Sequence, residues 1–106
     1  MNPNQATQGF SAMGSSARME VLQTLIKAGP DGLVVGDIQS RTKMPASTLA
    51  HHLKALHTAN LIIQTKHGRE ITSLANYAHL EALASYILQE CCSLQNTKTS
   101  QDELVS

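Results

Sequence analysis

Apolar residues recur at helical spacing in several stretches of this chain. The first clear stripe has four apolar residues that stand one to three positions apart: Met19, Leu22, Leu25 and Ile26. This spacing places them on one side and predicts a helix that buries that side. Ser15 or Ser16 can cap its start, and Gly29 with Pro30 ends it.

Two more helices are predicted on either side of a short turn. The first covers residues 36–42 with Ile38 turned inward, and the turn runs over residues 43–45. The second starts within MPASTLAHHLKAL and has a narrow apolar stripe made of Ala46, Leu49, Leu53 and Leu56. Two helices joined by so short a turn are typical of a helix-turn-helix.

After this pair the pattern becomes extended. Residues 61–66 and 70–74 flank the turn His67-Gly68-Arg69, which predicts a β-hairpin. A last apolar helix is predicted over residues 76–94, and its stripe suits packing against a second copy of the chain.

The two ends of the chain are polar, and residues 1–7 and 95–106 are predicted to be mobile. A short helix is expected around residues 8–13. We therefore expect one domain over residues 1–106. Its class is mainly α with a small β-hairpin, in a winged helix-turn-helix arrangement.

The composition narrows the class of protein further. With 106 residues, no Trp, one Phe and two Tyr, the chain supports one modest aliphatic core. No stretch reaches the roughly 18 to 20 apolar residues of a membrane span. The start MNPNQATQ also lacks the charged and apolar parts of an export signal. We expect a cytoplasmic protein with no membrane partner.

Charge is distributed unevenly, although eight basic and eight acidic residues give a net charge of zero. Between Ile38 and Arg69 there is no Asp or Glu. The same segment holds five of the eight basic residues: Arg41, Lys43, Lys54, Lys66 and Arg69. Such a concentration of cations is expected of a face that binds phosphates.

The polar side of the second helix adds hydrogen-bond donors that suit phosphates and base edges. Together with the turn and the hairpin it predicts an interface for double-stranded DNA with seven residues: Lys43, Ser47, Thr48, His51, Lys54, Lys66 and Arg69. The alternatives are an ordinary surface helix beside a plain connecting hairpin, and a winged helix that binds only proteins. Steep salt dependence of duplex binding separates these possibilities.

The two cysteines, Cys91 and Cys92, are adjacent near the end of the last predicted helix. Helical spacing places Cys91 within the apolar stripe and Cys92 at its edge. Adjacent thiols in a reducing compartment can form a ligand pair for a soft ion. A redox pair and inert packing stay open. The nearest histidine on that helix, His79, is about three turns away, and we expect no enzymatic activity.

Three segments resemble the ArsR family of bacterial winged-helix repressors. SARMEVL at residues 16–22 is similar to the family's early core helix, STLAHHLK at 47–54 to its recognition helix, and HGR at 67–69 to its wing tip. The resemblance implies a homodimer through the first and last helices, bound to an inverted-repeat operator. It also implies release of that operator when a metal, a metalloid or an oxidant is sensed.

Departures from the family pattern narrow the effector. Residues 33–38 contain no cysteine, unlike members that bind arsenite there, and His79 lacks the partners of a zinc site. The Cys91–Cys92 pair resembles that of a subgroup of arsenic-responsive members, and soft thiolates suit trivalent arsenic and antimony. Arsenite calls for a third thiol, which the chain does not have, whereas methylarsenite or phenylarsenite needs only two. A third ligand from the partner subunit would restore arsenite binding, and this alternative stays open. An organoarsenical effector is therefore predicted, with no cofactor required.

Overall fold

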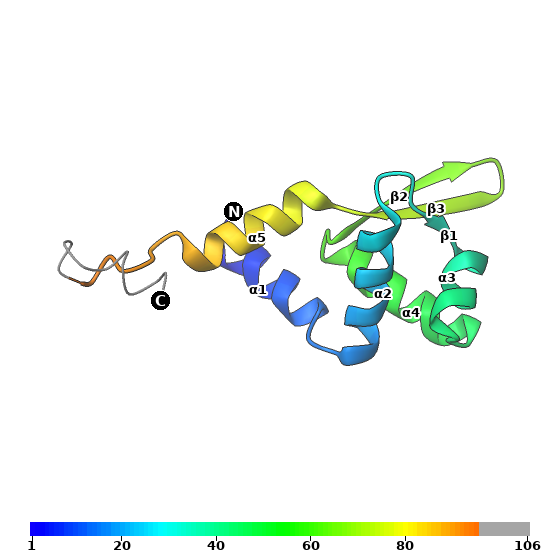
Figure 1. Ribbon diagram of the computed structural model, residues 1–106, viewed down its shortest axis with the longest axis horizontal. Coiled ribbons are helices and arrows are strands. Elements are labelled where there is room, and N and C mark those ends of the chain that lie inside the picture. The colour runs from blue at the N-terminus through cyan, green and yellow to red at the C-terminus, as the bar shows by residue number, and fades with distance from the viewer. Residues whose placement is uncertain (96–106) are drawn as a thin grey trace.

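The computed structural model describes residues 1–95, which contain five α-helices and a three-stranded antiparallel sheet (Figure 1). In chain order the elements are α1 Pro3–Ala12, α2 Ser16–Ala28, β1 Leu33–Val34, α3 Val35–Thr42, α4 Ala46–Thr58, β2 Ile62–His67, β3 Glu70–Ala75 and α5 Tyr77–Leu88. Figure 1 places α1 and α5 toward one end of the molecule and the β2–β3 hairpin with α3 toward the other. Residues 96–106 of the predicted tail lie outside the described part of the chain.

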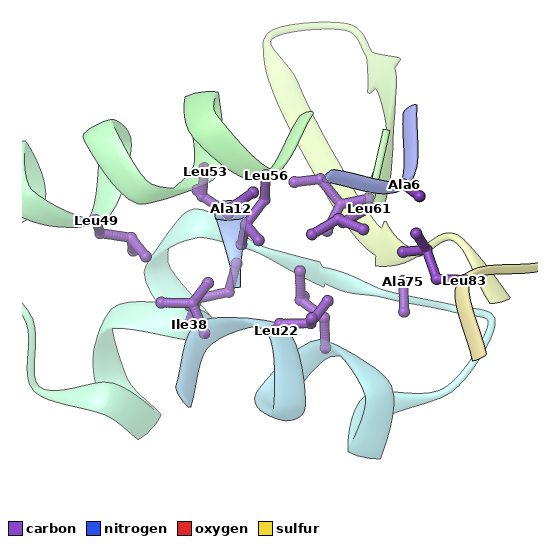
Figure 2. Close-up of a cluster of buried hydrophobic side chains, with 13 residues drawn as sticks. Ala6, Ala12, Leu22, Ile38, Leu49, Leu53, Leu56, Leu61, Ala75 and Leu83 are labelled. Atoms are coloured by element: carbon purple, nitrogen blue, oxygen red, sulfur yellow. The ribbon is translucent and has the colours of Figure 1, made fainter. Parts of the chain in front are cut away.

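An aliphatic core joins all the helices of the described chain to the sheet (Figure 2). Its buried members are Ala6, Ala12, Val21, Leu22, Leu25, Ile38, Leu49, Leu53, Leu56, Leu61, Ile62, Ala75 and Leu83. Burying each large aliphatic side chain contributes about 1.5 to 3 kcal/mol relative to leaving it exposed. The core therefore holds α4 in a fixed position against α2 and β2.

The second helix, α2, begins and ends where the sequence predicts. Ser15 caps it by accepting a hydrogen bond from the Arg18 backbone N–H at 3.3 Å, and Gly29 ends it with φ of 82°. A positive φ is readily adopted by glycine, which has no Cβ. The predicted apolar stripe needs one correction. Ile26 is 39% exposed, and Val21 takes the fully buried place.

The sheet has one strand more than the predicted hairpin, in the order β1-β3-β2. The hairpin itself is confirmed, with Lys66 opposite Ile71 and His67 opposite Glu70 beside the Gly68-Arg69 turn. The additional strand β1 pairs with β3 through Leu33 opposite Ser73. Two residues carry too little periodic pattern to predict a strand, so β1 follows from pairing in the folded chain.

The first helix starts five residues earlier than predicted, at Pro3 instead of Gln8. Asn2 caps it by accepting from the Gln5 backbone N–H at 2.8 Å, while the Gln5 side chain accepts from the Asn2 N–H at 3.0 Å. This reciprocal pair is a capping box with glutamine in the third helical position. Residues 3–7, which the sequence predicts to be mobile, are therefore helical.

The last helix is shorter than predicted, because α5 ends at Leu88 and not at residue 94. Residues 89–94 form successive turns, in which the Cys91 N–H donates to the Leu88 carbonyl at 2.9 Å. Ile87 and Leu88 are each 63% exposed, so the end of α5 lacks packing within the described chain. Tertiary packing supplies most of a helix's stability, and sequence periodicity alone does not continue it.

Candidate nucleic-acid interface

The helix-turn-helix consists of α3, a turn over residues 43–45, and α4. Lys43 ends α3 in the left-handed conformation with φ of 62°, and its N–H donates to the Gln39 carbonyl at 2.8 Å. The Gln39 side-chain amide then donates to the Met44 carbonyl at 3.3 Å. Pro45 begins α4 with an extended backbone. These bonds fix the direction in which α4 leaves the turn.

The two sides of α4 divide as the sequence predicts, except at its first residue. Leu49, Leu53 and Leu56 are buried, as expected, but Ala46 is exposed and does not belong to the apolar stripe. As the first residue of the helix, Ala46 lies beyond the edge of the core. Ser47, Thr48, His51 and Lys54 are all exposed. Their donors are available to a partner along one side of α4.

The hairpin presents the remaining predicted contacts. Lys66 lies near the end of β2, and Arg69 follows Gly68, whose φ of 64° forms the turn. Both basic side chains are exposed, as is Lys43 in the helix-turn-helix turn. The seven residues thus lie in three places, with four together on α4, one at the turn before it and two at the hairpin tip.

Sequence reasoning missed a side-chain hydrogen bond between α2 and α4. Arg18 Nε donates to His52 Nδ1 at 3.3 Å, and Arg18 Nη1 donates to the Ala12 carbonyl at 3.4 Å. Burial, then the charge of Arg18 and the neighbouring His51, lower the pKa of His52 below its ordinary 6.5. His52 is therefore held neutral against α2, while His51 beside it faces outward. Arg18 follows the capping Ser15, but no spacing rule in the sequence pairs it with residue 52.

The cysteine pair lies beyond the end of α5. The two Sγ atoms are 3.4 Å apart, Cys91 is exposed and Cys92 is half-buried. The prediction that Cys91 lies within a helical apolar stripe is wrong, because the helix stops three residues before it. Cys92 has a φ of 65°, and its hydrogen bond with Cys91, followed by burial, raises the pKa of its thiol. Within residues 1–95 no cluster of three His, Cys, Asp or Glu side chains could hold a metal ion.

His79, at the start of α5, makes its hydrogen-bond contacts with two asparagines and not with the partners of a metal site. Its Nδ1 lies 3.4 Å from Asn60 Nδ2, and its backbone N–H donates to Asn76 Oδ1 at 3.3 Å. Its Nε2 is buried and has no hydrogen-bond partner among the described residues. These contacts join the start of α5 to the end of α4.

A helix-turn-helix followed by a β-hairpin and closed by a terminal helix is a winged helix-turn-helix. Residues 13–65 match the family described as a helix-turn-helix domain, and the chain belongs to this family. No curated protein sequence matches the chain. None of the helices among residues 1–95 has the length and apolar character to cross a membrane.

Several solved structures share the fold. An ArsR-like transcriptional regulator from a Rhodococcus species has a TM-score of 0.74 at 23% identity, covering 97% of this chain and 93% of that one. HlyU from Vibrio cholerae has a TM-score of 0.66 at 23% identity, covering 87% and 99%. A homodimeric winged helix-turn-helix DNA-binding domain from Mycobacterium bovis, a possible ArsR-family regulator, has a TM-score of 0.64 at 22% identity, covering 83% and 82%.

Proposed function

We propose that this protein is a DNA-binding transcriptional repressor of the ArsR type. The observation that carries the proposal is the exposed side of α4, where Ser47, Thr48, His51 and Lys54 lie together in a segment without acids. Lys43, Lys66 and Arg69 add exposed positive charge at the turn before α4 and at the hairpin tip. An α-helix fits the major groove of duplex DNA, and basic residues beside it contact the backbone.

The repressor acts as a homodimer on an inverted-repeat operator. Ile87 and Leu88 expose apolar surface at the end of α5, which a second copy would cover. The Mycobacterium bovis domain with this fold is described as homodimeric. Two recognition helices related by a two-fold axis meet half-sites about one DNA turn apart, or roughly 34 Å.

A trivalent arsenical bound by Cys91 and Cys92 is the effector that releases the operator. The geometry supports a shared centre, because the two Sγ atoms lie 3.4 Å apart and belong to adjacent residues. With each bond at about 2.3 Å, the usual zinc–thiolate length, such a pair spans an angle of about 95°. A pyramidal arsenic or antimony centre accommodates that angle.

An organoarsenical such as methylarsenite is preferred over arsenite. Arsenite has three exchangeable positions, and no third His, Cys, Asp or Glu joins the pair within residues 1–95. Methylarsenite keeps its carbon bond and exchanges only two positions, which two thiols fill. Antimonite is a weaker candidate for the same reason as arsenite. The two hydroxyl groups of methylarsenite leave as water with the two thiol protons, so the exchange releases no net proton. Since the pKa of the Cys92 thiol is raised, binding should depend little on pH below that pKa.

The coupling to DNA runs through the end of α5. The Cys91 N–H bonds to the carbonyl of Leu88, the last residue of the helix. Closing both sulfurs on one arsenic atom would rearrange these turns, and with them the apolar surface that meets the second copy. A change in dimer packing alters the spacing of the two recognition helices. A coupling free energy of about 1 to 3 kcal/mol is enough for a useful switch.

Fluorescence anisotropy on an inverted-repeat duplex tests the proposal. The fully reduced protein is titrated onto the duplex and then, separately, with methylarsenite, arsenite and zinc. We expect binding that weakens steeply with salt, and release by methylarsenite at a lower concentration than by arsenite. The double variant Cys91→Ser/Cys92→Ser should bind DNA and ignore methylarsenite, whereas the control Ser93→Ala should behave as the native chain. Unchanged release from the double variant would refute the effector.

A redox switch is the second candidate, favoured by the same short Sγ–Sγ distance. A solved structure with this fold is described as reduced HlyU from Vibrio cholerae. In this case an oxidant removes two electrons and two protons from the thiols to form a disulfide. Release of DNA by a mild oxidant, reversed by dithiothreitol and absent in the double serine variant, would identify it. A chain that binds no duplex at all would instead be a protein-interaction module.

A further inference from the structure

An open groove lies between α1 and α4, apart from the cysteine pair and bordered by the core residue Ala12. Its volume is about 760 Å³, within the usual range of small-molecule sites. Figure 2 shows Ala12 of α1 beside Leu53 and Leu56 of α4. The groove is lined from α1 by Thr7, Gln8, Ser11 and Ala12, and from α4 and the residue after it by His51, Lys54, Ala55, Thr58 and Ala59.

The groove combines an apolar floor with polar side chains on both rims. Ala12 is buried and Ala55 and Ala59 are half-buried, so methyl groups form the deeper surface. Such small side chains leave space that larger ones would fill. Lys54 and His51 are exposed at the edge that belongs to α4. Lys54 carries the only formal charge in the lining, and no carboxylate opposes it.

We propose that this groove binds a small amphipathic monoanion, an aliphatic or aromatic carboxylate or sulfonate. The apolar part of the ligand would cover the alanine floor. Its anionic group would accept hydrogen bonds from the Lys54 ammonium and the His51 ring. Charge complementarity favours this class, because an anionic group would pair with Lys54, whereas an apolar cation would meet it with like charge.

Such a ligand would compete with DNA, a consequence that rests on the proposed function. Lys54 and His51 belong to the exposed side of α4 that is assigned to the duplex. One ammonium cannot pair with a bound carboxylate and a phosphate at full strength together. The groove would therefore be a second route to operator release, separate from Cys91 and Cys92. The binding step itself requires no DNA and is tested without it.

Decanoate and decanol are suitable probes because they share an apolar chain and differ in charge. The full-length, reduced protein is titrated with each below the concentration of micelle formation and followed by amide NMR shifts. We expect decanoate to shift the amides of Ala12, Ala55 and Ala59 in one saturable transition. Lys54→Gln should weaken decanoate binding by about fivefold or less, as for an exposed ion pair, and leave decanol binding unchanged.

Filling the groove from α1 provides the decisive variant. Ser11→Leu adds an apolar side chain to the lining without altering α4, and it should reduce binding of both probes by at least tenfold. Ser40→Leu makes the same change at an exposed site on α3, outside the groove, and should have no effect. Far-ultraviolet circular dichroism verifies that both variants are folded.

Three results would overturn the inference. Decanoate shifts confined to the end of α5 would place the ligand elsewhere, and equal effects of Lys54→Gln on both probes would refute the anionic class. Conversion of a dimer to a monomer by Ser11→Leu would show that a second copy fills the groove. Failure of the protein to bind any duplex would refute the proposed function but would leave the NMR result to decide the groove.

Discussion

His52 shows how a single side chain on the recognition helix serves the fold and not the partner. Its Nδ1 accepts a hydrogen bond from Arg18, and Arg18 also bonds to the end of α1 through the Ala12 carbonyl. Only an unprotonated Nδ1 can accept that bond. Protonation of His52 would therefore break a connection among α1, α2 and α4, with positive charge from Arg18 close by.

We expect the protein to lose stability as the pH is lowered, on account of this residue. The folded-state pKa of His52 is lowered, so below its ordinary 6.5 the unfolded chain takes up the proton more readily than the folded chain. Above pH 6.5 both states are neutral and the contribution is fully present. It is lost as the pH falls from 6.5 through the folded-state value.

Urea unfolding at pH 8, 6.5 and 5.5 measures this effect. His52→Asn should flatten the dependence of the unfolding free energy on pH. His57→Asn, at an exposed position on the same helix, is the matched control and should leave the dependence as it is. An equal flattening by both variants would mean that general charge on α4, and not the Arg18 bond, causes the pH dependence.

At the scale of elements, the contact between α1 and α5 depends on one glycine. A Cβ at Gly9 would lie 2.8 Å from Leu83 Cδ1 and 2.9 Å from Leu83 Cδ2, closer than real Cβ contacts. Gly9 and Leu83 are both buried, so the leucine has little space to move away. The absence of a side chain at residue 9 allows the two helices to approach.

Gly9→Ala should destabilise the protein by a net amount of about 1 kcal/mol. Overpacking costs about 1 to 3 kcal/mol, which exceeds the gain of up to about 1 kcal/mol from replacing glycine in a helix. Gly36→Ala in α3 meets no atom within 4 Å and should stabilise it by about 0.5 kcal/mol. Thermal unfolding of the two variants tests the pair. Stabilisation by both would show that α1 is not held tightly on α5.

Local signals predicted the middle of the chain well and its ends poorly. Ser15, Gly29 and the Gly68 turn mark the ends of elements by their own chemistry, and the structure confirms each of them. The end of α5 has no such signal, because no glycine or proline follows Leu88 before residue 95. Where that helix stops depends on what packs against it, which the pattern of one chain does not contain.

The parts of the candidate site differ in how far the sequence predicts them. The exposed side of α4 follows from helical periodicity once Leu49, Leu53 and Leu56 are assigned to the core, so its residues could be found in the sequence. The Arg18–His52 bond and the groove above Ala55 join elements that are distant along the chain. No spacing rule predicts such contacts, and they become visible only in the folded molecule.

At the scale of the whole molecule, the proposed DNA contacts of the hairpin and the proposed dimer contacts of α5 lie at opposite ends. The hairpin and α3 lie toward one end, while α1 and α5 lie toward the other (Figure 1). Ile87 and Leu88 on α5 expose more than half of their surface, which is costly in water unless another apolar surface covers them. A second copy joined there would leave both recognition helices free to contact one duplex.

Changing Ile87 and Leu88 to glutamate should therefore convert a dimer to a monomer, because charge replaces apolar surface at the interface. Sedimentation velocity measures the change, and Ile63→Glu, at a partly exposed site on β2, is the control that should stay dimeric. Binding to the inverted repeat should weaken with it. If a dimer binds at about 1 nM, a monomer with half of the binding free energy binds near 30 μM. A double variant that remains dimeric and binds normally would place the interface elsewhere than the end of α5.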